Sequence, residues 1–177
     1  TWPIMLFTAI AIWLEDCFRA PVLFHQERVG LHGRLFRVIK FRSMAVDAEG
    51  NGKARWATKG DNRITRVGRF IRKTRIDELP QILNVLAGDM AFIGPRPERP
   101  EFVKDLAAKS PYYNARHCVK RGITGWAQVQ YGYGATVEET KEKLKYDLFY
   151  IKNVSFFLDF WVVLKTVGVV LRGSGAR

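Results

Sequence analysis

The stretch Ile71-Arg-Lys-Thr-Arg-Ile-Asp-Glu-Leu-Pro-Gln-Ile-Leu-Asn-Val-Leu-Ala-Gly-Asp89 places two adjacent carboxylates, Asp77 and Glu78, directly after a run of cations. Pro80 is tolerated in the first turn of a helix and poorly further along it. Apolar residues then recur at helical spacing as far as Gly88, a common helix stop. The stretch therefore predicts a helix that begins near the two carboxylates and ends at the glycine.

The carboxylate pair has two interpretations. In the first, Asp77 is a helix N-cap and Glu78 is an acid in the first turn, which are common structural roles. In the second, the positive end of the helix and the preceding Arg side chains keep a carboxylate ionised. An ionised carboxylate beside phosphate-binding cations suggests phosphoryl chemistry, in which it attacks phosphorus or holds a metal ion.

The composition indicates an anionic partner. The 177 residues carry a net charge of +12 at pH 7, which suits nucleic acid, a phospholipid surface or a phosphorylated substrate. Between Arg28 and Arg75 the chain has 14 Lys or Arg and three acids, so this block holds nearly the whole excess. The two cysteines, Cys17 and Cys118, have no motif spacing, which argues against a disulfide scaffold or a zinc site.

Apolar segments lie near both ends of the chain. Trp2 to Leu14 would make about 20 Å of helix, too short for a bilayer core of roughly 30 Å. It fits a buried core helix, a re-entrant membrane segment or the tail of a longer hydrophobic segment. Residues 154–171 are mostly apolar with aromatic residues in the first half, which favours a helix lying in a membrane interface over one docked on the core.

The segments between these ends predict a small α+β fold that is predominantly helical. Residues 21–26 and 35–41 are typical of strands, and the Gly30-Leu-His-Gly33 turn joins them in a β-hairpin. Amphipathic helices are predicted at residues 63–74, 101–109 and 137–153.

Two further motifs carry candidate binding residues. In Gly94-Pro-Arg-Pro97, the prolines fix the backbone around Arg96, either to hold its guanidinium for a phosphate contact or as a plain turn with a surface Arg. Residues 122–134 are rich in glycine and aromatic residues and include Gln128 and Tyr131. We expect this segment to be a loop that stacks a base or sugar, or simply packs.

Five motifs follow one another along the chain: Pro21-Val-Leu-Phe-His-Gln-Glu-Arg-Val-Gly30, Phe36-Arg-Val-Ile-Lys-Phe-Arg-Ser-Met44, Arg72 with Asp77-Glu-Leu-Pro-Gln81, Gly94-Pro-Arg-Pro97, and Gly122-Ile-Thr-Gly-Trp-Ala-Gln128. Their order resembles that of the bacterial sugar transferases, which are monotopic polyprenyl-phosphate phosphoglycosyl transferases. The resemblance covers residues 3–173. The chain departs from the family at Arg121, where Pro is common, and at residues 130–134, where many members have Asn-Gly-Arg.

The resemblance implies a reaction and assigns residues to it. A sugar-1-phosphate moves from a UDP-sugar to polyprenyl (undecaprenyl) phosphate with release of UMP, as the initiating step of exopolysaccharide or other surface glycan synthesis. Asp77 is then the nucleophile of a covalent phospho-sugar intermediate, and Glu78 is a catalytic residue associated with Mg²⁺. Phosphate-binding roles fall on Lys40, Arg72 and Arg96. Arg75, Gln128 and Tyr131 are candidates for nucleotide or sugar contacts.

The resemblance also implies a membrane arrangement. Residues 1–20 would be the second half of a truncated re-entrant membrane helix, residues 21–153 the catalytic domain and residues 154–177 a C-terminal amphipathic interfacial helix. The catalytic domain would lie on the cytoplasmic face of the bacterial inner membrane, against its anionic surface, with a homo-oligomer possible.

The alternative to the transferase is a basic, non-enzymatic module that binds a membrane or nucleic acid. The sequence shows no helix-turn-helix, RNA-recognition or zinc pattern, which argues against nucleic acid as a partner.

Overall fold

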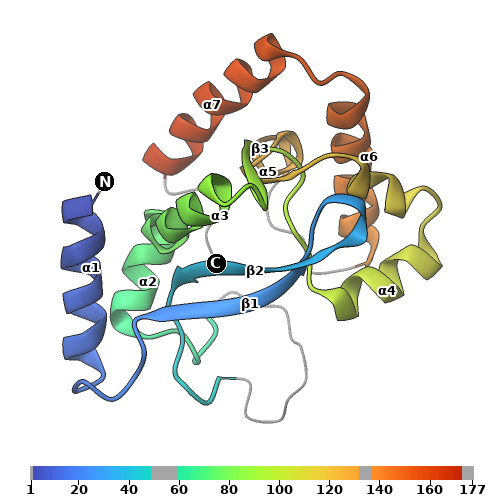
Figure 1. Cartoon of the computed structure of the whole chain (residues 1–177). Coiled ribbons are helices and arrows are strands. Elements are labelled where there is room, and N and C mark those ends of the chain that lie inside the picture. Colours follow the sequence, from blue (N-terminus) through green and yellow to red (C-terminus); the bar gives the residue numbers. More distant parts are fainter. Residues whose placement is uncertain (1, 49–59, 132–136, 173–177) are drawn as a thin grey trace.

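The computed structural model describes residues 2–48, 60–131 and 137–172 (Figure 1). As the sequence predicts, the fold mixes α and β structure and is mostly helical, with two small two-stranded sheets among the described residues. The α-helices are α1 (Trp2–Glu15), α2 (Arg66–Lys73), α3 (Ile82–Leu86), α4 (Pro100–Lys109), α5 (Trp126–Gln130), α6 (Val137–Lys152) and α7 (Phe156–Leu171). The strands are β1 (Leu23–Val29), β2 (Leu35–Phe41), β3 (Met90–Ile93) and β4 (Arg121–Thr124), and the 3₁₀ helices are η1 (Leu31–Gly33), η2 (Ile76–Gln81) and η3 (Tyr113–Cys118).

The predicted hairpin is confirmed. Strands β1 and β2 pair antiparallel from Leu23↔Phe41 to Val29↔Leu35, so β1 continues three residues beyond the predicted end at Gln26. The turn η1 has Gly33 at φ +77°, in the left-handed region that glycine adopts without strain. Strand β2 packs on η2, which joins α2 to α3.

The helix α1 packs on this half of the molecule by one narrow stripe. Ile12 lies in a buried cluster with Phe41 of β2 and Ile71 of α2, and α1 stands at the edge of the fold in Figure 1. Only Thr8 and Ile12 of this helix are buried, whereas most of its large apolar side chains are exposed. The structure therefore shows α1 as a docked helix with an unburied apolar surface, and it does not show a re-entrant path.

The length and apolar character of each helix show whether it could cross a membrane. Within the described ranges, every helix falls short of the length and apolar character that crossing a bilayer requires.

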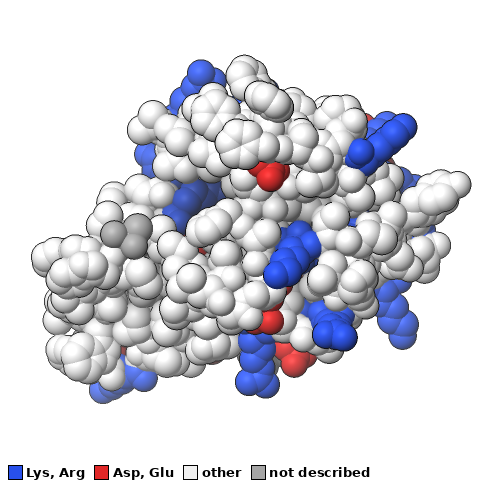
Figure 2. All heavy atoms as spheres, turned by 45° about the horizontal axis from the view of Figure 1, so that its top comes forward, with Lys and Arg blue, Asp and Glu red and all other residues white. Residues whose placement is uncertain are grey.

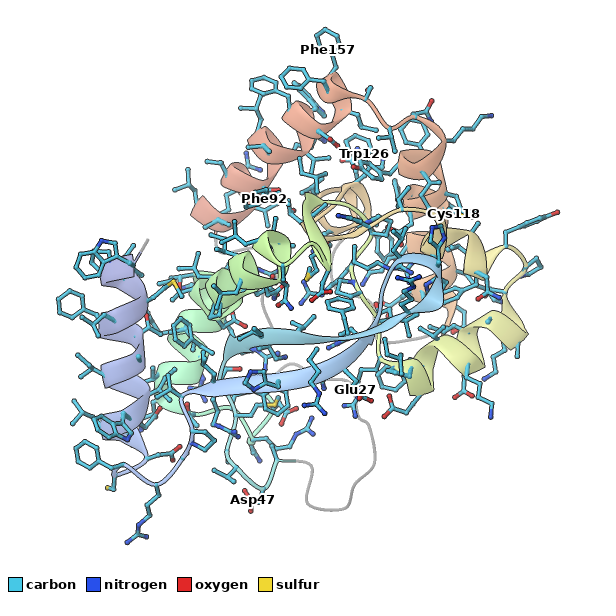
Figure 3. The ribbon with its side chains drawn as sticks, viewed as in Figure 1. Glu27, Asp47, Phe92, Cys118, Trp126 and Phe157 are labelled. Atoms are coloured by element: carbon cyan, nitrogen blue, oxygen red, sulfur yellow. The ribbon has the colours of Figure 1, made fainter. Side chains whose placement is uncertain are left out.

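The helix α7 is attached to the opposite half of the fold. Its N-cap is Ser155, whose Oγ accepts a hydrogen bond from the Leu158 amide (3.3 Å). Polar contacts hold its inner side: Thr166 bonds Thr124 of β4 (2.8 Å), and the Lys165 ammonium donates to Gln130 Oε1 (2.7 Å). Phe157 points outward from the start of the helix (Figure 3) and is 83% exposed.

The second sheet was not predicted. Strands β3 and β4 pair in parallel, from Met90↔Arg121 to Ile93↔Thr124. The expectation of a loop over residues 122–134 is wrong for β4 and α5, while residues 132–136 lie outside the described ranges. Gly122 and Gly125 lie so close to the backbone of Gly94 that a Cβ atom on either would overlap it. This close approach of backbones explains the glycines that the sequence suggested were loop residues.

Candidate active site

Asp77 and Glu78 lie in the 3₁₀ helix η2. Both side chains are buried, with 8% and 6% of their area exposed. The chain reaches this position through α2, whose N-cap Thr65 accepts a hydrogen bond from the Gly68 amide (2.9 Å). Arg75 then adopts φ +59°, a left-handed conformation that is strained for a residue with a side chain and that recurs at functional sites.

The N-cap interpretation of Asp77 is wrong. The N-cap position of η2 is Arg75, and no side chain caps this helix. Asp77 Oδ1 is buried and has no hydrogen-bond partner among the residues that the structure describes. An unsatisfied buried acceptor costs about 1–3 kcal/mol. A catalytic role, a bound ion or water, or stored strain explains such groups in native proteins.

Glu78 is held by two guanidinium groups. Arg96 Nη2 donates to Glu78 Oε1 at 2.6 Å, and Arg75 Nη1 lies 3.6 Å from the same oxygen. Burial acts against the charged form of Glu78, but Arg96 and Arg75 outweigh it, and the pKa of Glu78 is lowered from its usual value. Glu78 is therefore ionised and fixed in place.

Asp77 behaves differently from its neighbour. Burial, followed by the adjacent charge of Glu78, raises the pKa of Asp77 to about 6, while Lys40, Arg72 and Arg75 act in the opposite direction. The sequence predicted only the effect of the cations. At pH 7 the carboxylate is still mostly ionised, and it is a stronger base and nucleophile than an exposed aspartate.

Lys40 reaches the site from β2. Its Nζ lies 5.3 Å from the centre of the Phe24 ring, and burial, with help from Arg28, lowers the pKa of Lys40 to about 8. The buried amide of Asn84 binds the open edge of β2: it accepts from the Ile39 amide (3.0 Å) and donates to the Arg37 carbonyl (2.8 Å). Asn84 thus fixes the strand that carries Lys40 against the segment that carries the carboxylates.

The Gly94–Pro97 turn is held on several sides. Arg116 Nη2 donates to the Arg96 carbonyl (3.0 Å), and its Nε forms a buried ion pair with Asp147 (2.7 Å). The neighbouring carbonyls accept as well: that of Pro95 from the Gly122 amide (3.1 Å), that of Pro97 from Arg28 Nη1 (3.1 Å) and that of Glu98 from the Val29 amide (3.0 Å). The turn is therefore rigid, and Arg96 is aimed at Glu78 rather than being a plain surface residue.

The structure brings most of the predicted site residues together. Lys40, Arg72, Arg75 and Arg96 surround the carboxylate pair and act on the pKa values there. Gln128 lies on a neighbouring surface: its Nε2 donates to the Ile123 carbonyl (3.0 Å), and its Oε1 is buried and unpaired within the described chain.

Tyr131 packs against the Tyr146 ring with centroids 6.2 Å apart, and none of its described contacts reaches the carboxylates. Sequence reasoning missed Arg28, Asn84, Arg116 and Asp147, because single polar residues in otherwise ordinary segments give no signal before their partners are known.

The two carboxylates fit a divalent cation that takes most of its ligands from substrate phosphates and water. Mg²⁺ is usually bound by one or two carboxylates together with substrate phosphates and water, and Asp77 Oδ1 and the adjacent Glu78 provide such carboxylates. Across residues 2–48, 60–131 and 137–172 there is no group of three or more His, Cys, Asp or Glu that could hold a metal. The predicted association of Mg²⁺ with Glu78 stays a prediction.

A family model and individual relatives identify the same group of proteins as similar to this chain. Residues 1–173 match the family described as "Bacterial sugar transferase". The chain is 52% identical over 175 residues to the UDP-N-acetylgalactosamine-undecaprenyl-phosphate N-acetylgalactosaminephosphotransferase of Aeromonas hydrophila, covering 99% of this chain and 41% of that protein. It is 45% identical over 172 residues to the UDP-glucose:undecaprenyl-phosphate glucose-1-phosphate transferase of Xanthomonas campestris pv. campestris, covering 96% of this chain and 35% of that protein. The chain thus spans less than half of the length of these two relatives.

Proposed function

The chain belongs to the bacterial sugar transferase family, and we propose that it transfers a sugar-1-phosphate from a UDP-sugar to undecaprenyl phosphate through a covalent bond to Asp77. The names of its relatives support the two substrates, since they include UDP-sugar donors and undecaprenyl-phosphate acceptors. The observation that carries the proposal is the buried carboxylate oxygen of Asp77, which is unpaired in the described structure and lies among Lys40, Arg72 and Arg75.

The reaction has two displacements at one phosphorus atom. In the first, an Asp77 oxygen forms a bond to the phosphorus that bears the sugar, and the bond from this phosphorus to the bridging oxygen breaks, so that its electron pair leaves with UMP. In the second, a phosphate oxygen of undecaprenyl phosphate attacks the same phosphorus. The electron pair of the aspartyl–phosphorus bond then returns to Asp77, and undecaprenyl-diphosphate-sugar is formed.

The cations around the pair allow one anion to attack another. A carboxylate that approaches a diphosphate meets repulsion, and negative charge builds up on the departing phosphate during the reaction. Lys40 and Arg75 act on both carboxylates, Arg72 acts on Asp77, and Arg96 is fixed by Glu78. When bound by Glu78, Mg²⁺ would supply further positive charge at the diphosphate.

The apolar surface of the molecule supports a location at a membrane. Figure 2 shows a mostly uncharged face over α7, and exposed apolar patches of this kind mark membrane or protein contact sites. Both α1 and α7 carry exposed aromatic residues, as interfacial helices do. We place α1 and α7 in the interface of the inner membrane, with the basic block toward anionic head groups on the cytoplasmic side. The exposed aromatic residues are Trp2, Phe7, Trp13, Phe156, Phe157, Phe160 and Trp161.

A labelled donor tests the proposal. The full chain in detergent is given Mg²⁺ and UDP-sugars labelled in the sugar phosphate, without acceptor, and protein-bound label and free UMP are measured. We expect label on the polypeptide and one UMP per site, and release of the label when undecaprenyl phosphate is added. UMP formation in the presence of acceptor, without any trapped label when acceptor is absent, would refute the covalent step.

A further inference from the structure

A cleft adjoins the candidate active site at Arg96. It lies between the Gly94–Pro97 turn and the helices α5 and α6, and Arg96 is part of its wall while also bonding Glu78. Its charged lining residues are Arg96, Glu98, Arg116, Lys143 and Asp147, and Tyr113, Gln128 and Thr140 are its uncharged polar ones. No step of the reaction described above uses Thr140 or Lys143.

The charges in this cleft suit an anion. Its two acids have guanidinium partners of their own, since Asp147 pairs with Arg116 at 2.7 Å and Glu98 lies 3.8 Å from Arg28. The lining also includes the Lys143 ammonium and the Arg96 guanidinium, together with hydrogen-bonding groups on Gln128 and Thr140. The buried Oε1 of Gln128 has no partner in the described structure and needs a donor such as a hydroxyl or an N–H group.

The chemistry of the donor requires such a site beside the carboxylate pair. A nucleoside diphosphate sugar has two phosphates that share one bridging oxygen, so the phosphate that leaves lies a few ångströms from the one that reacts. Since Arg96 borders both the carboxylate pair and the cleft, the leaving phosphate can lie in the cleft while the reacting phosphate lies beside Asp77, with one guanidinium close to both.

Resting on the proposed function, we propose that this cleft binds the leaving phosphate, the one that departs with the nucleoside, with Lys143 as the cation that contacts it. Burial lowers the pKa of Lys143, with Glu98 opposing this effect, which shows that its ammonium has lost part of its hydration. A partly desolvated ammonium interacts more strongly with a phosphate than one in water does.

The test uses a matched pair of lysines on one helix. Lys143→Met removes the proposed contact, while Lys145→Met is the control, because the Lys145 side chain is 71% exposed and pairs with Glu142 (2.6 Å). Lys143→Arg keeps the charge. Binding of UMP and of uridine to the full chain in detergent is measured by titration calorimetry, and the KM values for UDP-glucose or UDP-N-acetylgalactosamine and for undecaprenyl phosphate are measured separately.

We expect Lys143→Met to weaken UMP binding by roughly 10- to 100-fold, as loss of a charge-assisted hydrogen bond does. Uridine binding and the KM for undecaprenyl phosphate should stay unchanged, Lys145→Met should match the parent, and Lys143→Arg should keep most of the UMP affinity. The inference is overturned if both methionine variants bind UMP equally, or if the loss appears in the KM for undecaprenyl phosphate instead. A chain that binds UMP in this way but releases none from any UDP-sugar would refute the proposed function and leave the subsite standing.

Discussion

Replacing Asp77 with Asn should abolish transfer and stabilise the fold at the same time. The pKa of Asp77 is raised from 3.8 to about 6, chiefly by burial and then by Glu78, so the folded state disfavours the ionised carboxylate. A rise of about two pKa units corresponds to about 3 kcal/mol, at 1.36 kcal/mol per unit. An amide has nearly the same shape and no charge, so Asp77→Asn should recover a part of this energy while removing the proposed nucleophile.

The stability that Asp77→Asn gains over the parent should increase with pH. Because the folded pKa lies above the unfolded one, the folded state binds the proton more tightly between pH 3.8 and about 6, and stability falls as the pH rises through this window. Asp77→Asn should therefore be more stable than the parent at pH 7.5, by about 1–3 kcal/mol, and the difference should vanish near pH 4. Urea unfolding in detergent, followed by tryptophan fluorescence at both pH values, measures it.

A matched control is Asp89→Asn, because Asp89 lies on the same segment and is exposed, so that its charge is hydrated in both states. This variant should leave stability and UMP release close to those of the parent. The reasoning about burial is refuted if Asp77→Asn is less stable than the parent at pH 7.5, or if its stability difference does not change with pH. Near-normal UMP release by Asp77→Asn would remove Asp77 as the nucleophile.

Three other predictions concern the pH dependence of activity, the hydrogen bonds of Asn84 and binding to a membrane. The kcat/KM for UMP release should rise through pH 6 as Asp77 ionises and fall above about pH 8 as Lys40 loses its proton. Lys40→Arg should move this fall in kcat/KM to higher pH. A flat profile from pH 5 to 9 would contradict both assignments. Asn84→Leu should destabilise the fold by about 2 kcal/mol or more, since it leaves the Ile39 amide and the Arg37 carbonyl unpaired; a stability equal to the parent's would show that the strand edge is not held there. Flotation with anionic liposomes should resist high salt and should be weakened several-fold by Phe157→Ser. Tyr112→Ser is the control and should have no effect, because Tyr112 is about as exposed (80%) and lies outside α7. Full release by salt would mean that charge alone holds the protein.

The family and the elements with strong local patterns could be read from the chain itself. The β1–β2 hairpin, the long helices α1, α6 and α7, and the stop near Gly88 follow from periodicity and turn residues, which are properties of neighbouring positions. The spacing of Asp77, Glu78 and the cations is likewise local, so the candidate catalytic pair was visible before any contact was known.

The tertiary structure alone decided what depends on distant partners and on burial. The β3–β4 sheet joins two four-residue strands that are about thirty positions apart, too short for a periodic signal. Asn84 and Arg116 became positioning residues only when the β2 edge and the Arg96 carbonyl came within hydrogen-bond distance. The sequence showed the cations near Asp77 but not the loss of solvent around it, and because desolvation outweighs those cations, folding turned an ordinary aspartate into one with a pKa of about 6.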